Sequence, residues 1–296
     1  MSASRWGEGA CMGLPEPRCR GSWDLTVIEG LLKSENKHLP SPLYVSLIEE
    51  DSHTREALAN WTLQVCSEHG SVDAVFPLAI SLLDRYLSQS FSLPISPLCL
   101  TAACILLASK LADEKAVGAD ALCTAARFAF LPQHLRDMEI IVLASLHWDI
   151  TAVTPQDFLP HFLSALRDRA GTLGGDTESL RSFLRARSST LAALCVCQYQ
   201  FLGTRPSVIA AAALNCALRE LGLQRVQLDR MTSTLAGLCK TDAAAVQHFS
   251  EMIEINMLRR SQRMGLKERD LNVNVSDEET QECRASTPTD LRDIDF

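Results

Sequence analysis

Two stretches of this sequence are apolar on nearly every side and are built largely from small residues. One covers residues 98–108 and follows Pro97, and the other covers residues 208–218 and follows Pro206. A helix that is apolar all round belongs in the middle of a bundle, where small side chains let its neighbours approach closely. Proline at the first helical position is well suited to start such a helix. We therefore expect the chain to fold around two central helices.

Helical patterns surround each central stretch in a similar order. Apolar residues recur every three or four positions, and this spacing predicts helices. In the first half they lie near 54–68, 72–88, 97–111, 119–127 and 132–146. In the second half one helix begins at 154–155, and four more lie near 177–199, 206–221, 228–238 and 242–260. The two halves predict an all-α fold of two five-helix domains in tandem, over 52–151 and 152–260.

The remaining segments differ in composition. Residues 1–21 lack periodicity and are predicted to be disordered, and residues 22–51 are predicted to form a short helix, ended by Pro40 and Pro42, and a linker. Residues 261–296 are acidic and nearly free of aromatic side chains, so we expect a disordered regulatory tail.

Composition excludes several classes of function. A hydrophobic fraction of 47% excludes wholesale disorder, and a net charge of −8 argues against a general nucleic-acid binder, which needs a basic surface. Neither of the two longest apolar runs is long enough to span a membrane, and the N-terminus lacks the apolar segment of a signal peptide. We expect neither nucleic acid nor membrane as a partner.

Sites for catalysis, metals and cofactors are not evident. The sequence has no G-x-S-x-G, H-E-x-x-H, G-x-G-x-x-G or P-loop motif, and its seven histidines are scattered. None of the eleven cysteines forms a C-x-x-C pair, and Cys195 and Cys197 would point to nearly opposite sides of a helix. We expect no metal and no cofactor, reduced buried thiols in a cytosolic or nuclear protein, and no enzymatic activity.

Several short motifs stand in a fixed order: VFPLA at 75–79, LDRYLS at 83–88, LLASK at 106–110, ME at 138–139, LHW at 146–148, TPQDF at 154–158 and TPTDLRDID at 287–295. Together they resemble the cyclins, and most closely the D-type cyclins. The resemblance implies two tandem cyclin boxes of five helices each. It also implies a regulatory subunit that activates a G1 cyclin-dependent kinase of the four/six type and promotes the G1/S transition through phosphorylation of retinoblastoma-family substrates. Kinase inhibitor proteins and a ubiquitin ligase are further implied partners, with localisation in nucleus and cytoplasm.

The resemblance assigns kinase contacts to five residues. Lys110 and Glu139 match family positions that hydrogen-bond the kinase beside its movable αC helix, and apolar contacts match Leu111, Leu143 and Ile150. From the residues alone, an internal Lys–Glu ion pair, solvated helix ends and plain core positions stay open as alternatives.

Two further assignments concern the first box. Arg55 and Asp84 match a structural ion pair inside it. Arg55 also belongs, with Leu58 and Trp61, to a substrate-docking patch, which is weakened here because Thr54 and Ala57 replace larger apolar family residues. We expect weak recruitment of R-x-L substrates and inhibitors.

The resemblance also assigns a regulatory site, and the sequence shows a second departure from the family besides the weakened docking patch. Thr287, followed by Pro288, matches a phosphorylation site that promotes nuclear export and degradation. The L-x-C-x-E motif with which D-type cyclins dock the retinoblastoma protein is missing.

Two other classes of protein stay open as alternatives at this point. Tandem cyclin boxes also occur in general transcription factors, but these need a basic face. A helical enzyme would require an occupied metal or cofactor site.

Overall fold

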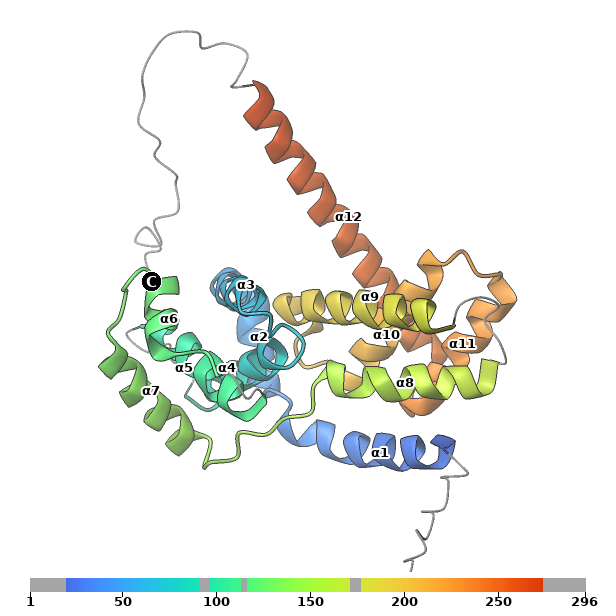
Figure 1. The fold of residues 1–296 in the computed structure, drawn as a ribbon, viewed down its shortest axis with the longest axis horizontal. Helices are drawn as coiled ribbons and strands as arrows, with labels where there is room; N and C mark the ends of the chain where they lie inside the picture. Colours follow the sequence, from blue (N-terminus) through green and yellow to red (C-terminus); the bar gives the residue numbers. More distant parts are fainter. Residues whose placement is uncertain (1–19, 91–95, 113–115, 171–176, 274–296) are drawn as a thin grey trace, which may run out of the picture. The chain divides into compact units, whose positions relative to one another are not determined.

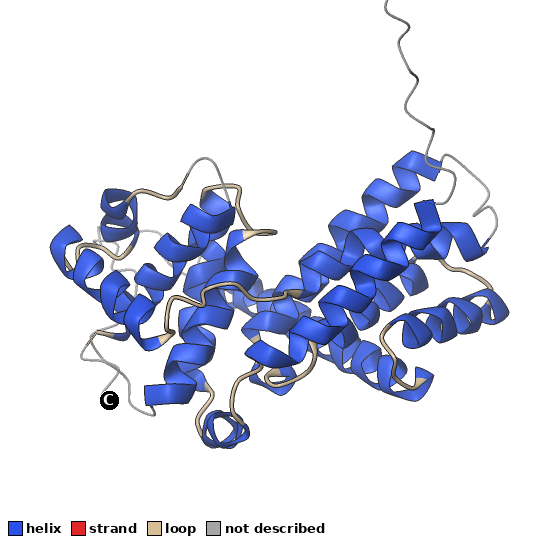
Figure 2. Ribbon diagram, turned by 90° about the horizontal axis from the view of Figure 1, so that it is seen from below, coloured by secondary structure: helices blue, strands red, loops and turns tan. Residues whose placement is uncertain are grey.

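The computed structural model describes residues 20–90, 96–112, 116–170 and 177–273. Within these ranges the chain forms helices and connecting loops and no strand (Figures 1 and 2). The helices are α1 (Arg20–Glu35), η1 (Asn36–His38), α2 (Pro42–Glu50), α3 (His53–Glu68), α4 (Val75–Ser90), α5 (Pro97–Ala112), α6 (Ala119–Ala125), α7 (Pro132–Ser145), α8 (Pro155–Ala170), α9 (Thr177–Cys197), η2 (Tyr199–Phe201), α10 (Pro206–Glu220), α11 (Arg225–Leu238) and α12 (Ala243–Val273). The prediction of an all-α fold of two five-helix domains is confirmed, with α3–α7 and α8–α12 as the two sets.

The two apolar stretches are the central helices of these sets. Every side chain from Cys99 to Ser109 of α5 is buried, and α3, α4 and α7 pack around that helix. Every side chain from Ser207 to Leu218 of α10 is buried, with α8, α9 and α11 around it. Each central helix thus positions the helices that surround it.

Two helical segments differ from the sequence prediction. Pro42 does not end a helix but occupies the first position of α2, and the Ser41 hydroxyl caps this helix by accepting from the Tyr44 N–H at 3.2 Å. Helix α12 continues to Val273, beyond the expected end near Arg260, because no proline interrupts it. The chain divides into two units, residues 1–253 and 254–296, and α12 begins in the first.

A buried ion pair connects the two boxes. Arg55 donates from Nε and Nη2 to the two carboxylate oxygens of Asp84, at 2.8 Å in both cases, and the two side chains are 3% and 7% exposed. Its remaining N–H groups reach the carbonyls of Val196 and Cys197 at the end of α9 at 3.2 and 3.4 Å. The Tyr44 hydroxyl donates to Asp84 at 2.9 Å. Burial alone would lower the pKa of Arg55, but the charge and hydrogen bonds of Asp84 raise it above its usual value.

We predict that Arg55→Ala lowers the free energy of unfolding by about 3–5 kcal/mol, because it leaves the Asp84 carboxylate buried without its charged partner. Urea unfolding followed by circular dichroism measures the loss. A control is available in Arg187, which pairs with Glu220 on the surface, with side chains 31% and 39% exposed. Arg187→Ala should cost less than about 1 kcal/mol. Equal losses for the two variants would show that burial of the Arg55 pair adds nothing.

The cysteines of the described residues are buried and form no disulfide. They are Cys66, Cys99, Cys104, Cys123, Cys195, Cys197, Cys216 and Cys239. Burial raises the pKa of the Cys66 thiol to about 12, that of Cys99 to about 11 and that of Cys239 to about 12. The reactive thiolate is therefore scarce at neutral pH.

These eight thiols should resist iodoacetamide in the folded protein near neutral pH and react once guanidinium has unfolded the chain. Mass spectrometry of the digested protein assigns the modified positions. If any of these thiols in the folded protein reacted as fast as a thiol that is fully exposed to solvent, the conclusion that they are buried would be contradicted.

Candidate functional site

Lys110 lies where α5 emerges from the core. The helix body up to Ser109 is buried, whereas the Lys110 side chain is 49% exposed. It lies in the last turn of α5, where the helix dipole favours a cation. The ammonium is thus a charge that the buried helix presents at the surface.

Glu139 lies on α7, which packs against α5, and its side chain is 15% exposed. Lys110 donates directly to its carboxylate, so the two residues form the internal ion pair that the sequence left open as an alternative. An ammonium group has three N–H donors and a carboxylate accepts several bonds, so a pair of this kind retains capacity to bind a partner. The structure therefore brings the two predicted residues together at one place.

The predicted apolar positions differ in exposure. Leu111 is 48% exposed beside Lys110, whereas Leu143 is buried and Ile150 is partly buried against the first-box core. Only Leu111 of the three offers a largely open surface.

Two strongly exposed apolar side chains lie on α7 or just after it. Ile140, next to Glu139, is 64% exposed, and Trp148, just beyond α7, is 73% exposed. Large apolar side chains left in water are candidates for contact with a partner. The sequence motif contained Trp148, but motif matching alone could not show that its side chain faces solvent. We call Lys110, Leu111, Glu139, Ile140 and Trp148 the charged-apolar face.

The predicted docking patch is largely inside the molecule. Arg55 is 4% exposed and uses its guanidinium in the ion pair with Asp84, and Leu58 is 8% exposed. Trp61, Thr54 and Ala57 are partly buried. Of the two roles assigned to Arg55, the geometry assigns its side chain to the ion pair.

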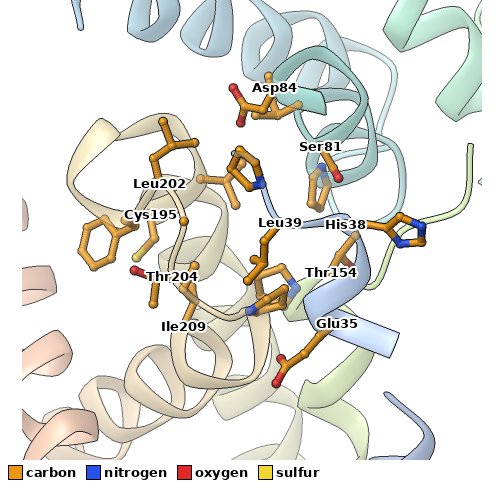
Figure 3. Close-up of a pocket in the computed structure, with 18 of the residues that line it drawn as sticks. Glu35, His38, Leu39, Ser81, Asp84, Thr154, Cys195, Leu202, Thr204 and Ile209 are labelled. Atoms are coloured by element: carbon orange, nitrogen blue, oxygen red, sulfur yellow. The ribbon is translucent and has the colours of Figure 1, made fainter. Parts of the chain in front are cut away.

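A cavity of about 90 Å³ lies between the boxes and is lined by the end of α1, by α4 and by the segment from α9 to α10 (Figure 3). The two carboxylates in the lining of the cavity already have partners. Asp84 binds Arg55, and Glu35 accepts hydrogen bonds from the N–H and the hydroxyl of Ser207 at 2.9 and 3.0 Å. A space of this size holds a few water molecules. Lys110 and Glu139 do not line it, so the charged-apolar face is a separate surface.

In the ranges that the structure describes, no three His, Cys, Asp or Glu side chains gather closely enough to hold a metal ion. None of the described helices combines the length and the apolarity of a membrane span.

The chain matches two protein-family models. The cyclin N-terminal domain matches residues 26–151, and the cyclin C-terminal domain matches residues 153–279. The chain belongs to the cyclin family. Cyclins are regulatory subunits of protein kinases and not enzymes, so this cyclin is a regulatory chain.

Curated relatives of this cyclin are D-type cyclins. It is 35% identical to human G1/S-specific cyclin-D3 over 81% of this chain and 80% of the relative. It is 32% identical to rat G1/S-specific cyclin-D2 (91% and 92% covered) and 31% identical to zebrafish G1/S-specific cyclin-D1 (91% of each covered). The resemblance inferred from the motifs is confirmed.

Two solved structures share the fold of this cyclin. A viral cyclin from herpesvirus saimiri superposes with a TM-score of 0.57 at 23% identity, covering 79% of this chain and 95% of that one. A chain of the CAK complex of Chaetomium thermophilum gives a TM-score of 0.52 at 12% identity, covering 79% and 74%. At these identities they support the fold alone.

Proposed function

We propose that this cyclin binds a G1 cyclin-dependent kinase of the four/six type and activates it allosterically. The observation that carries the proposal is the charged-apolar face, where an ion pair between α5 and α7 reaches the surface and Leu111, Ile140 and Trp148, on these helices or just after them, are exposed. Relatives named G1/S-specific cyclins support the G1 assignment. Phosphorylation of retinoblastoma-family proteins, and with it the G1/S transition, is the proposed output.

The face has the composition that activation requires. An active kinase needs its β3 Lys–αC Glu pair in place, and a partner that binds only that arrangement shifts the population toward it. Moving such an equilibrium from 1:99 to 99:1 takes about 5.5 kcal/mol of differential binding. An apolar centre with a few buried polar contacts supplies energies of this size.

Leu143 and Ile150 contribute to this proposal in a different way from Leu111. Because Leu143 is buried and Ile150 partly so, they support α7 and the segment after it from within. Leu111, Ile140 and Trp148 are the side chains that would lose water on binding.

Substrate recruitment by this cyclin is proposed to be weak. Arg55 and Leu58 are buried, Thr54 and Ala57 offer little apolar area, and the sequence lacks L-x-C-x-E. R-x-L substrates and kinase inhibitor proteins would therefore depend on contacts with the kinase subunit.

Turnover is proposed to depend on Thr287, which lies outside the described residues. The Thr287-Pro288 pair in an acidic segment suits a proline-directed kinase. The added charge would be recognised by a ubiquitin ligase and would shift the protein from nucleus to cytoplasm before degradation.

The direct test is co-purification with a G1 cyclin-dependent kinase, followed by an assay of retinoblastoma-fragment phosphorylation. Wild type should bind and activate, and Lys110→Ala combined with Glu139→Ala should reduce activation at least about tenfold, because both polar contacts to the kinase are lost. Arg187→Ala with Glu220→Ala removes a surface pair on α9 and α10 and should leave activation unchanged.

A folded wild type that neither binds nor activates the kinase would refute the proposed function. Full activation by the double variant at Lys110 and Glu139 would refute the role of that pair.

Thr287→Ala should lengthen the half-life of the protein in cells, because the phosphorylated recognition site cannot form. A cycloheximide chase measures it. Thr289→Ala is the matched control, since no proline follows Thr289, and it should leave turnover unchanged. The same half-life for Thr287→Ala and wild type would disprove the assignment.

A further inference from the structure

The segment that follows α7 carries Trp148 of the proposed kinase site on strained backbone. We call residues 147–151 the linker turn; they include Trp148 and Ile150. His147 and Trp148 have positive φ angles of 52° and 62°. This left-handed conformation is unfavourable for bulky residues. Backbone hydrogen bonds close the turn locally, from the N–H of Trp148 to the Leu143 carbonyl and from the N–H of Asp149 to the Leu146 carbonyl, and contacts from other elements add to them.

Arg85 holds the backbone of the linker turn from the first-box side. It lies on α4, is 8% exposed, and donates to the carbonyl oxygens of Asp149 at 2.6 Å and of Thr151 at 3.1 Å. These bonds secure the main chain on both sides of Ile150.

Asp149 ties the same turn to the segment after α1. Its Oδ2 accepts from Lys37 Nζ at 2.8 Å and is 3.2 Å from His38 Nε2. The hydrogen bonds of Lys37 and then of His38 hold the pKa of the Asp149 carboxyl below its usual range. The carboxylate is therefore charged at neutral pH.

The Lys37–His38 segment is itself firmly placed. Glu35, just before it, is 1% exposed and accepts from Ser207 at the start of α10, and α1 packs on α8. The Asp149 carboxylate thus joins the linker turn to a segment anchored on the second box.

We propose that Asp149 is a positioning residue for kinase binding, which fixes the linker turn through Lys37 and His38 so that Trp148 is presented in one arrangement. The inference rests on the proposed function and adds a positioning residue to the same site. A preorganised turn binds more tightly because less conformational freedom is lost on association. Neither Asp149 nor Lys37 needs to touch the kinase for this effect.

The test compares kinase affinity with stability in full-length variants. Asp149→Asn keeps the shape of the side chain and removes its charge, and Lys37→Ala removes the partner, which is 66% exposed and unimportant for the core. Each should weaken the affinity for a G1 cyclin-dependent kinase about threefold to tenfold, with an unchanged thermal midpoint. Lys37→Arg should restore wild-type affinity, and the double variant should be no weaker than Asp149→Asn alone.

Glu220→Gln is the matched control, because it neutralises a carboxylate of similar exposure whose partner is Arg187. Its affinity should equal that of wild type. If wild type binds and both Asp149→Asn and Lys37→Ala bind as tightly, the inference is overturned while the proposed function stands. An equal loss in Glu220→Gln overturns it too, since the effect would then follow total charge. Failure of wild type to bind overturns the proposed function itself.

Discussion

The burial of α5 on every side is the constraint on which the first box depends. Its small side chains can leave water only if other helices surround it, and α3, α4 and α7 do so. This packing places Glu139 of α7 beside Lys110, the residue at which α5 reaches solvent. The charged-apolar face is thus a consequence of core packing, and its charges are held on rigid helices.

The second box is joined to the first by polar contacts that are mostly buried. Arg55 reaches from Asp84 to the carbonyls of Val196 and Cys197, and the Tyr199 N–H donates to Glu56 at 3.2 Å. Such contacts are directional, so they specify one arrangement more strictly than apolar packing does. A regulatory chain that acts by presenting a surface depends on this rigidity.

Features of local pattern could be predicted from the sequence. The central helices, their proline starts and the five-helix repeat all follow from periodicity and composition. Local rules also produced the errors: Pro42 can end one helix or start the next, and only the Ser41 cap decides between them. The acidic composition after residue 260 predicts a tail, whereas α12 continues to Val273.

Contacts between residues far apart in the chain, and the exposure of single side chains, could not be predicted from the sequence. Residues Lys37 and Asp149 meet only because α1 is anchored on the second box. Family resemblance named Leu143 and Ile150, but it could not show that Leu143 is buried or that Ile140 and Trp148 are exposed, because exposure depends on tertiary packing. The residue types at 147 and 148 do not predict a left-handed backbone conformation at two consecutive positions, because neither residue is glycine or asparagine.

Hydrogen–deuterium exchange of this cyclin, alone and with a G1 cyclin-dependent kinase, tests the central claim most directly. The account predicts that the kinase slows exchange at the end of α5, along α7 and in residues 147–151, with little change in α11. Binding that protects other helices and leaves these three segments unchanged would contradict it.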